Sequence, residues 1–228
     1  MKCYKYTMKL GILNIISFLI FIPLIGLIYF ISPTEFINYF DNCNYILLFS
    51  LYFIWVIIHE LLHYIGFIMD KEVNNKNVVM GILLEKSICY CMCKQLISKK
   101  RILISLLMPL IFIGIVTLII GIFINDMTLM LLSILNISGC SGDIMMFIFA
   151  AKLPTDIKYY DLDDPTSFNI MTTKEIDRNP FGLKLISVDD YNDEITMAND
   201  KKKITISKWS TIILFILIIA IIVSIFLK

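Results

Sequence analysis

Residues 45–69 read YILLFSLYFIWVIIHELLHYIGFIM. This stretch is long enough to cross a bilayer, whose hydrocarbon core takes about 20 apolar residues of helix. It holds both histidines of the chain, His59 and His63, with Glu60 between them. Ionisable side chains inside an apolar span are costly unless they are paired or bound to a ligand. The stretch therefore predicts a membrane helix that carries a functional polar cluster.

The spacing of these three residues points to a metal. On a helix, His59 and His63 are one turn apart, so both imidazoles leave the same face and can bind one metal ion. Glu60 lies beside them, where a carboxylate can take a proton from water on the metal. We therefore expect the chemistry of a zinc hydrolase, with His59 and His63 as ligands and Glu60 as the catalytic residue.

The composition predicts an integral membrane protein. Hydrophobic residues make up 58% of the chain, and the mean hydropathy is +0.82, well above the values of soluble domains. No basic patch interleaved with aromatic residues suggests a nucleic-acid partner. We expect an all-α fold, a polytopic transmembrane helix bundle of about five spans. The predicted spans are residues 10–32, 45–69, 102–124, 128–151 and 209–227.

Lysine and arginine predict the orientation, because they gather in cytoplasmic loops. Residues 1–9 and the loop 70–101 are rich in lysine, whereas the loop 33–44 contains neither lysine nor arginine. Residues 152–208 carry many charges of both signs. We therefore expect the N-terminus and both long loops in the cytoplasm, the protein in the cell membrane, and the active site near its cytoplasmic side.

Catalytic zinc takes three protein ligands and keeps one open position, so a third ligand is needed. With the predicted span ends, His59 and His63 lie roughly 15 and 9 Å deep and Asp143 about 12 Å deep, at 1.5 Å per helical residue. Asp143 is the only acid of its span and is the predicted third ligand. The alternatives are Glu85, Asp70 and Cys140.

Small and polar residues surround Asp143. Gly139 and Gly142 would let this helix approach the second span closely, and Gly66 could do the same from the other side. Asn136 lies seven residues before Asp143, on nearly the same helix face. It could bind the substrate backbone or stabilise an oxyanion, and an interhelical hydrogen bond is an equal alternative.

Two further segments have a recognisable character. Cys89, Cys91 and Cys93 alternate, so on a strand they share one face. We expect a β-hairpin between residues 78 and 95, and a second metal site there is the less favoured alternative. Residues 152–208 predict a small cytoplasmic polar appendage with short strands at 183–188 and 204–207. The expected domains are 1–44 (anchor and outer loop), 45–151 (metalloprotease-like core), 152–208 (polar segment) and 209–228 (C-terminal anchor).

Taken together, these residues resemble the putative zincin peptidase family of integral membrane proteins, which is distantly similar to the site-2 intramembrane metalloproteases. The resemblance covers roughly residues 45–170. It rests on His-Glu-Leu-Leu-His-Tyr-Ile-Gly at 59–66, the cysteine-rich strand, Met108-Pro109, Ser141-Gly142-Asp143, and Lys152-Leu153-Pro154 with the acidic run after it. The resemblance implies that His59, His63 and Asp143 bind zinc and that Glu60 is the catalytic acid and base.

The sequence thus predicts a membrane-embedded zinc metalloprotease that acts on membrane-protein or peptide substrates. One alternative is a metal-binding or transport protein that uses the same cluster. Transport requires a polar path on both sides of the metal, and the outer halves of the second and fourth spans are nearly wholly apolar. The other alternative is a non-catalytic scaffold, for which Glu60 would be dispensable.

Overall fold

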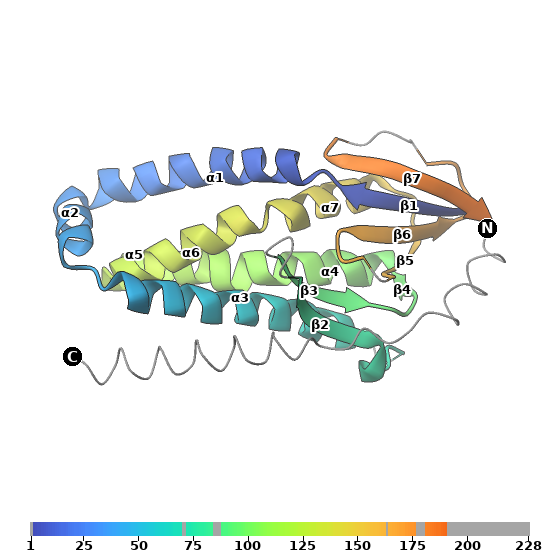
Figure 1. Ribbon diagram of the computed structural model, residues 1–228, viewed down its shortest axis with the longest axis horizontal. Coiled ribbons are helices and arrows are strands. Elements are labelled where there is room, and N and C mark those ends of the chain that lie inside the picture. Colours follow the sequence, from blue (N-terminus) through green and yellow to red (C-terminus); the bar gives the residue numbers. More distant parts are fainter. Residues whose placement is uncertain (1, 70–71, 84–87, 163, 177–180, 191–228) are drawn as a thin grey trace. The chain divides into compact units, whose positions relative to one another are not determined.

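The computed structural model describes residues 2–69, 72–83, 88–162, 164–176 and 181–190 (Figure 1). The chain divides into two compact units. Of the described residues, those within 1–15, 60–108 and 141–204 form the first unit, and those within 16–59 and 109–140 form the second. The predicted division into four segments stays a prediction.

Long apolar helices dominate the described chain. They are α1 (Leu10–Ile31), α2 (Pro33–Asn42), α3 (Tyr45–Ile68), α4 (Lys99–Pro109), the π-helix η3 (Leu110–Val116), α5 (Thr117–Ile124), α6 (Met127–Gly139) and α7 (Ser141–Lys152), with a short 3-10 turn, η1, at Asn75–Asn77. Among the described residues, three helices are long and apolar enough to cross a membrane: Leu10–Ile31, Tyr45–Ile68 and Lys99–Ile124. These helices coincide with three of the predicted spans.

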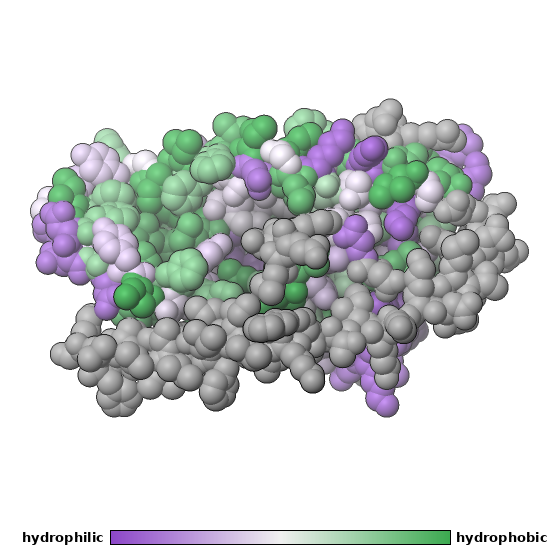
Figure 2. Space-filling view, in the orientation of Figure 1, coloured by the Kyte–Doolittle hydropathy of each residue, from purple (hydrophilic) through white to green (hydrophobic). Residues whose placement is uncertain are grey.

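The fourth predicted span is broken. It consists of α6 and α7, which are interrupted at Cys140 and count as one span only if the bent pair crosses together. The fifth predicted span, residues 209–227, lies outside the described residues. In Figure 2, hydrophobic side chains gather over the helices, and hydrophilic ones gather around α2 and the strands. Phe30 and Phe123 are 84% and 85% exposed, as suits side chains that face lipid.

The strands form two sheets. Their bounds are β1 (Lys2–Met8), β2 (Val78–Leu83), β3 (Ile88–Cys93), β4 (Ile97–Ser98), β5 (Lys158–Tyr160), β6 (Ser167–Thr172) and β7 (Leu183–Asp190). The larger sheet is antiparallel with the order β4-β5-β6-β1-β7. β2 and β3 pair by themselves, from Val78 opposite Cys93 to Leu83 opposite Ile88, which confirms the predicted hairpin.

The prediction of an all-α fold is wrong, because the first unit contains this five-stranded sheet. The sequence of its inner strand β1 indicates only a lysine-rich N-terminus and no strand. Cys3, Tyr4 and Tyr6 of β1 are at most 1% exposed, so the strand is a core element between β6 and β7. The strand predicted at 183–188 is confirmed as part of β7, and the one at 204–207 lies outside the described residues.

The polar composition of residues 152–208 gives no clear signal for the other strands. β6 reads Ser-Phe-Asn-Ile-Met-Thr, and all six residues are buried. Half of these side chains are polar, so the segment lacks the apolar run that signals a buried strand. Part of the predicted appendage is therefore packed sheet.

The core of the first unit joins the sheet to two helices. Tyr6 of β1 meets Phe168 of β6 and Phe149 of α7, with ring centroids 5.8 and 5.1 Å apart. Ile102 of α4 belongs to the same buried cluster. Because large aromatic side chains contribute much of the burial energy, these contacts hold α7 and α4 in place. Those two helices carry Asp143 and Ser105.

The second unit is helical. Gly121 of α5 lies against α6, where an added Cβ would come within 3.0 Å of the Met130 side chain. The turn between these helices uses Asn125 in the left-handed conformation, with φ of 54°, which asparagine tolerates. Asp126 then caps α6 by accepting a hydrogen bond from the Leu129 amide at 2.8 Å.

The segment predicted as an outer loop contains α2. It begins at Pro33, in the first turn of the helix, where proline is favoured. Phe36 and Phe40 of α2 pack against a buried cluster that includes Ile28 and Met130. The short amphipathic helix thus covers one end of α1 and α6 within the second unit.

Candidate metal centre

Helix α3 carries both histidines. The boundary between the two units falls inside this continuous helix, after His59, so His59 and His63 are one helical turn apart within a single element. His63 is 7% exposed and His59 is partly buried. The predicted placement of the pair on one helix face is therefore present in the structure.

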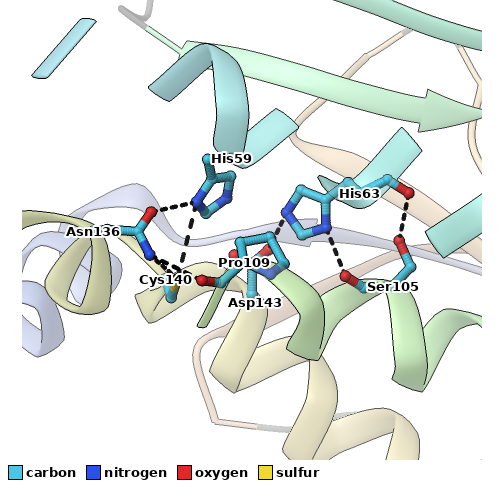
Figure 3. Close-up of polar contacts among 7 residues, drawn as sticks. All are labelled: His59, His63, Ser105, Pro109, Asn136, Cys140 and Asp143. Carbon is cyan, nitrogen blue, oxygen red and sulfur yellow. Dashed lines mark hydrogen bonds and ion pairs between the residues drawn. The ribbon is translucent and has the colours of Figure 1, made fainter. Parts of the chain in front are cut away.

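His63 is held by α4. Its Nδ1 donates a hydrogen bond to the backbone carbonyl of Ser105 at 2.9 Å, and the Ser105 hydroxyl donates to the backbone carbonyl of His63 at 3.0 Å (Figure 3). Both residues are buried, and Ser105 is fully inaccessible. This reciprocal pair fixes the ring and the local backbone of α3 together.

A glycine makes the reciprocal pair possible. A Cβ on Gly66 would lie 2.6 Å from the Ser105 Cα, so only glycine lets α3 and α4 approach this closely. The predicted close approach at Gly139 and Gly142 is not found. No atom of the described residues lies within 4 Å of a Cβ on Gly139, and a Cβ on Gly142 would make ordinary contacts with Met8 and Leu13.

His59 is held in the same way by α6. Its Nδ1 lies 2.9 Å from Oδ1 of Asn136, which is 5% exposed. The amide nitrogen of Asn136 donates to the Pro109 carbonyl at 3.1 Å and lies 3.7 Å from the Cys140 sulfur. Both ends of the amide are thus engaged within the protein. The predicted alternative of an interhelical hydrogen bond is present, and the substrate-positioning role of Asn136 stays a prediction.

These contacts determine which ring nitrogens remain for a metal. A carbonyl oxygen only accepts hydrogen bonds, so Nδ1 of each histidine carries the proton and Nε2 carries the lone pair. Anchoring one imidazole nitrogen to a protein acceptor is how metal sites orient their histidines. Both Nε2 atoms are therefore the expected ligand atoms of His59 and His63.

Asp143 completes the group. Its Oδ1 lies 3.4 Å from Nε2 of His63 (Figure 3). Asp143 stands in the first turn of α7, and its side chain is 18% exposed. The ligand atoms of His59, His63 and Asp143 all lie within 4.8 Å of one another. The three side chains could hold one metal ion between them, as the sequence predicts.

The donor set fits zinc. Nitrogen and carboxylate ligands bind zinc at about 2.0–2.2 Å, so two ligands of a tetrahedral ion are about 3.4 Å apart. The separation of His63 Nε2 and Asp143 Oδ1 has this value. Three protein ligands are also the number that catalytic zinc takes, with a fourth position left for water or substrate.

The alternatives to Asp143 fare differently. Glu85 and Asp70 lie outside the described residues. Cys140 is fully buried, and its sulfur lies 4.0 Å from Nδ1 of His59, which is the nitrogen that faces the protein rather than the metal. Cys140 therefore belongs to the surroundings of His59, on the far side of the ring from the ligand atom.

Glu60 follows His59 on α3 and is half-buried. The pKa of the Cys91 thiol on β3 is raised mainly by burial and further by the negative charge of Glu60. Glu60 therefore lies close to this strand. The catalytic role predicted for Glu60 stays a prediction.

The cysteine strand gives no second metal site within the described residues. There, only His59, His63 and Asp143 bring three ligand side chains together, and Cys89, Cys91 and Cys93 form no disulfide. Cys93 instead meets Asp161, whose Oδ2 accepts a hydrogen bond from the Cys93 amide at 2.8 Å. The Asp161 amide donates to the Cys93 carbonyl at 2.8 Å, which joins β3 to the segment after β5.

Sequence reasoning missed two residues around this centre. Ser105 is a single serine inside an apolar span. Its only distinguishing feature in the sequence is its position, about one helical turn after the start of the third predicted span. Asp161 lies in the acidic run after Pro154, where the sequence predicts only a polar appendage. Its side chain is 5% exposed, and Tyr159 donates a hydrogen bond to its Oδ1 at 2.6 Å. Burial raises the pKa of Asp161 to about 7.

Comparison with known families agrees with the geometry. Residues 52–158 match the family described as "Putative zincin peptidase". This match confirms the family resemblance predicted from the sequence, and it contains His59, Glu60, His63 and Asp143. Similarity to the site-2 proteases stays a prediction. No curated protein and no solved structure matches the chain.

Proposed function

We propose that this protein is a membrane-embedded zinc metallopeptidase that hydrolyses peptide bonds of membrane-associated proteins or peptides. The observation that carries the proposal is the triad of His59, His63 and Asp143, whose ligand atoms lie within 4.8 Å of one another. The match of residues 52–158 to a family of zincin peptidases supports it. From the distribution of lysine and arginine we place the site near the cytoplasmic side of the cell membrane.

The chain's residues have separate tasks in this proposal. Zinc, when bound, would act as a Lewis acid on the scissile carbonyl and would lower the pKa of a water molecule. Asn136 and Ser105 keep the two imidazole rings in one orientation and one tautomer. Asp143 contributes a negative charge, which stabilises a dication in surroundings of low polarity.

Glu60 performs the proton transfers. Its carboxylate takes a proton from the attacking water as the oxygen adds to the carbonyl carbon, and it later delivers that proton to the nitrogen of the leaving amine. A transmembrane helix cannot be cleaved directly, because its carbonyls are engaged in intrahelical hydrogen bonds. The proposed substrate is therefore a segment that is unwound or extended at the cleavage point.

The test is Glu60→Gln beside a matched control, Glu35→Gln, which makes the same change on an exposed position of α2. Purified protein in detergent is assayed with fluorescein-labelled casein, and zinc is measured by elemental analysis. General acid–base catalysis contributes at least about 100-fold to a rate, so Glu60→Gln should lose this factor and keep its zinc. Glu35→Gln should behave as wild type.

Two outcomes would count against the proposal. Cleavage at the wild-type rate by Glu60→Gln would remove Glu60 from the mechanism. Cleavage that persists after a chelator has stripped the zinc would show that the reaction does not depend on the metal. A non-catalytic scaffold predicts no loss of its activity in cells carrying Glu60→Gln.

A further inference from the structure

A groove runs along the first turns of α4. Its volume is about 410 Å³, and its lining combines basic and apolar side chains with one hydroxyl. The lining residues are Lys99, Lys100, Leu103, Ile104, Leu107 and Thr155. All of them belong to the first unit, and none belongs to the metal centre. The groove is therefore a feature of its own.

The apolar wall of the groove is one face of α4. Leu103, Ile104 and Leu107 follow Lys100 at spacings of three, four and seven residues, which places them in one stripe. None of the three is fully buried. A stripe of this kind at the start of a membrane span offers a surface for a hydrocarbon chain.

Lys99 supplies a fixed charge in the lining. Its ammonium group donates hydrogen bonds to the backbone carbonyls of Ala151 at 2.8 Å and Leu153 at 2.5 Å. Both carbonyls lie at the C-terminal end of α7, where unpaired acceptors attract cations. Lys99 is thereby held in one place, and a full positive charge remains beside the groove.

Lys100 supplies a charge that is available to a ligand. It is exposed, and it makes no hydrogen bond or ion pair with the part of the chain that the structure describes. Asp156 is next to Thr155 in sequence, but its Oδ2 accepts hydrogen bonds from the hydroxyls of Thr172 and Thr173 at 3.0 and 2.9 Å. The acid nearest in sequence is therefore turned to β6 and the residues after it.

We propose that this groove binds one anionic glycerophospholipid. Its phosphate would meet Lys100 and Thr155, and an acyl chain would follow Leu103 and Leu107. The helix Lys99–Ile124 is a candidate membrane span, so its first turn stands where lipid headgroups meet hydrocarbon. A basic group next to an apolar stripe complements an anionic lipid on both counts, whereas a zwitterionic lipid carries no net charge for Lys100 to attract.

The experiment uses the full-length protein in nanodiscs and in detergent. Binding of phosphatidylglycerol and of phosphatidylcholine is titrated by native mass spectrometry for wild type, Lys100→Gln, Leu107→Ser and Lys76→Gln. Lys76 is an exposed lysine of η1, so its variant makes the same change in net charge away from the groove. Melting in detergent without added lipid shows that each variant is folded.

One lysine near an anionic lipid surface contributes about 1 kcal/mol, a factor of about five in affinity. Lys100→Gln should therefore weaken phosphatidylglycerol binding about fivefold, and Lys76→Gln should leave it within a factor of two. Leu107→Ser should weaken it without changing the preference for the anionic lipid.

Four results would overturn the proposal. Equal binding of phosphatidylglycerol and phosphatidylcholine would show that the groove does not select an anionic headgroup. Equal losses in Lys76→Gln and Lys100→Gln would show diffuse attraction to the protein's charge. Competition by inorganic phosphate at the affinity of the lipid would show a phosphate site without an acyl chain. If Leu107→Ser binds as wild type, the apolar wall has no part in binding.

Discussion

The substitution Gly66→Ala adds one methyl group between α3 and α4, and it tests whether the packing of these helices supports metal binding. A Cβ added there would meet Ser105 at 2.6 Å from its Cα, 2.9 Å from its Cβ and 3.0 Å from its hydroxyl oxygen. The first of these atoms is backbone, so no rotamer change relieves the contact. To restore an ordinary separation of about 3.6 Å, α3 and α4 must part by about 1 Å, and overpacking of this size costs about 1–3 kcal/mol.

The same displacement breaks the contacts that orient His63. Its hydrogen bonds with Ser105 are 2.9 and 3.0 Å long, and a further 1 Å takes both beyond hydrogen-bond range. Loss of the group that orients a metal-bound histidine typically lowers metal affinity about 10–100-fold. Gly66→Ala should therefore show both a lower melting temperature and weaker zinc binding.

The assay is competition for zinc against a chelating dye, combined with thermal unfolding in detergent. Gly26→Ala is the matched control, because no atom in the part of the chain that the structure describes lies within 4 Å of a Cβ at that helical position. It should match or exceed the stability of wild type, since alanine favours a helix over glycine by about 1 kcal/mol. Wild-type zinc affinity in Gly66→Ala would refute the account of how His63 is positioned.

Two further predictions follow from the surroundings of the centre. Asn136→Leu should weaken zinc binding about 10–100-fold, because Nδ1 of His59 loses its acceptor at 2.9 Å; unchanged affinity in the dye competition would separate Asn136 from metal binding. Burial raises the pKa of Asp161 from 3.8 to about 7, so the folded state binds more protons than the unfolded state between these values and loses stability as pH rises, by at most about 1.4 kcal/mol per pH unit. Denaturant unfolding of Asp161→Asn should depend less on pH between 4 and 7 than unfolding of wild type, and equal slopes would contradict this.

The metal centre was largely predictable because its constraints are local or energetic. His59 and His63 are four residues apart, so helix periodicity alone places them on one face. Asp143 was found because a lone carboxylate in an apolar span needs a partner at its own depth. The hairpin was visible for a similar reason, as Cys89, Cys91 and Cys93 alternate with the period of a strand.

The five-stranded sheet was not predictable by the same reasoning. Its inner strand β1 pairs with β6 and β7, more than 150 residues away along the chain, and no local pattern encodes that pairing. Lys2 and Lys5 have the pattern of lysines that mark a cytoplasmic terminus. The polar residues of β6 give no sign in the sequence that this strand is buried. The partners of the histidines, Ser105 and Asn136, likewise depend on which helices pack together.

Metal content tests the central claim most directly. Purified wild-type protein, Asp143→Ala, His63→Ala and Cys140→Ser would be measured side by side by elemental analysis after reconstitution with zinc. Because a catalytic site needs three protein ligands, we expect about one zinc per chain in wild type and in Cys140→Ser, and little in the other two variants. Zinc retained by Asp143→Ala, or absent from wild type, would contradict the account.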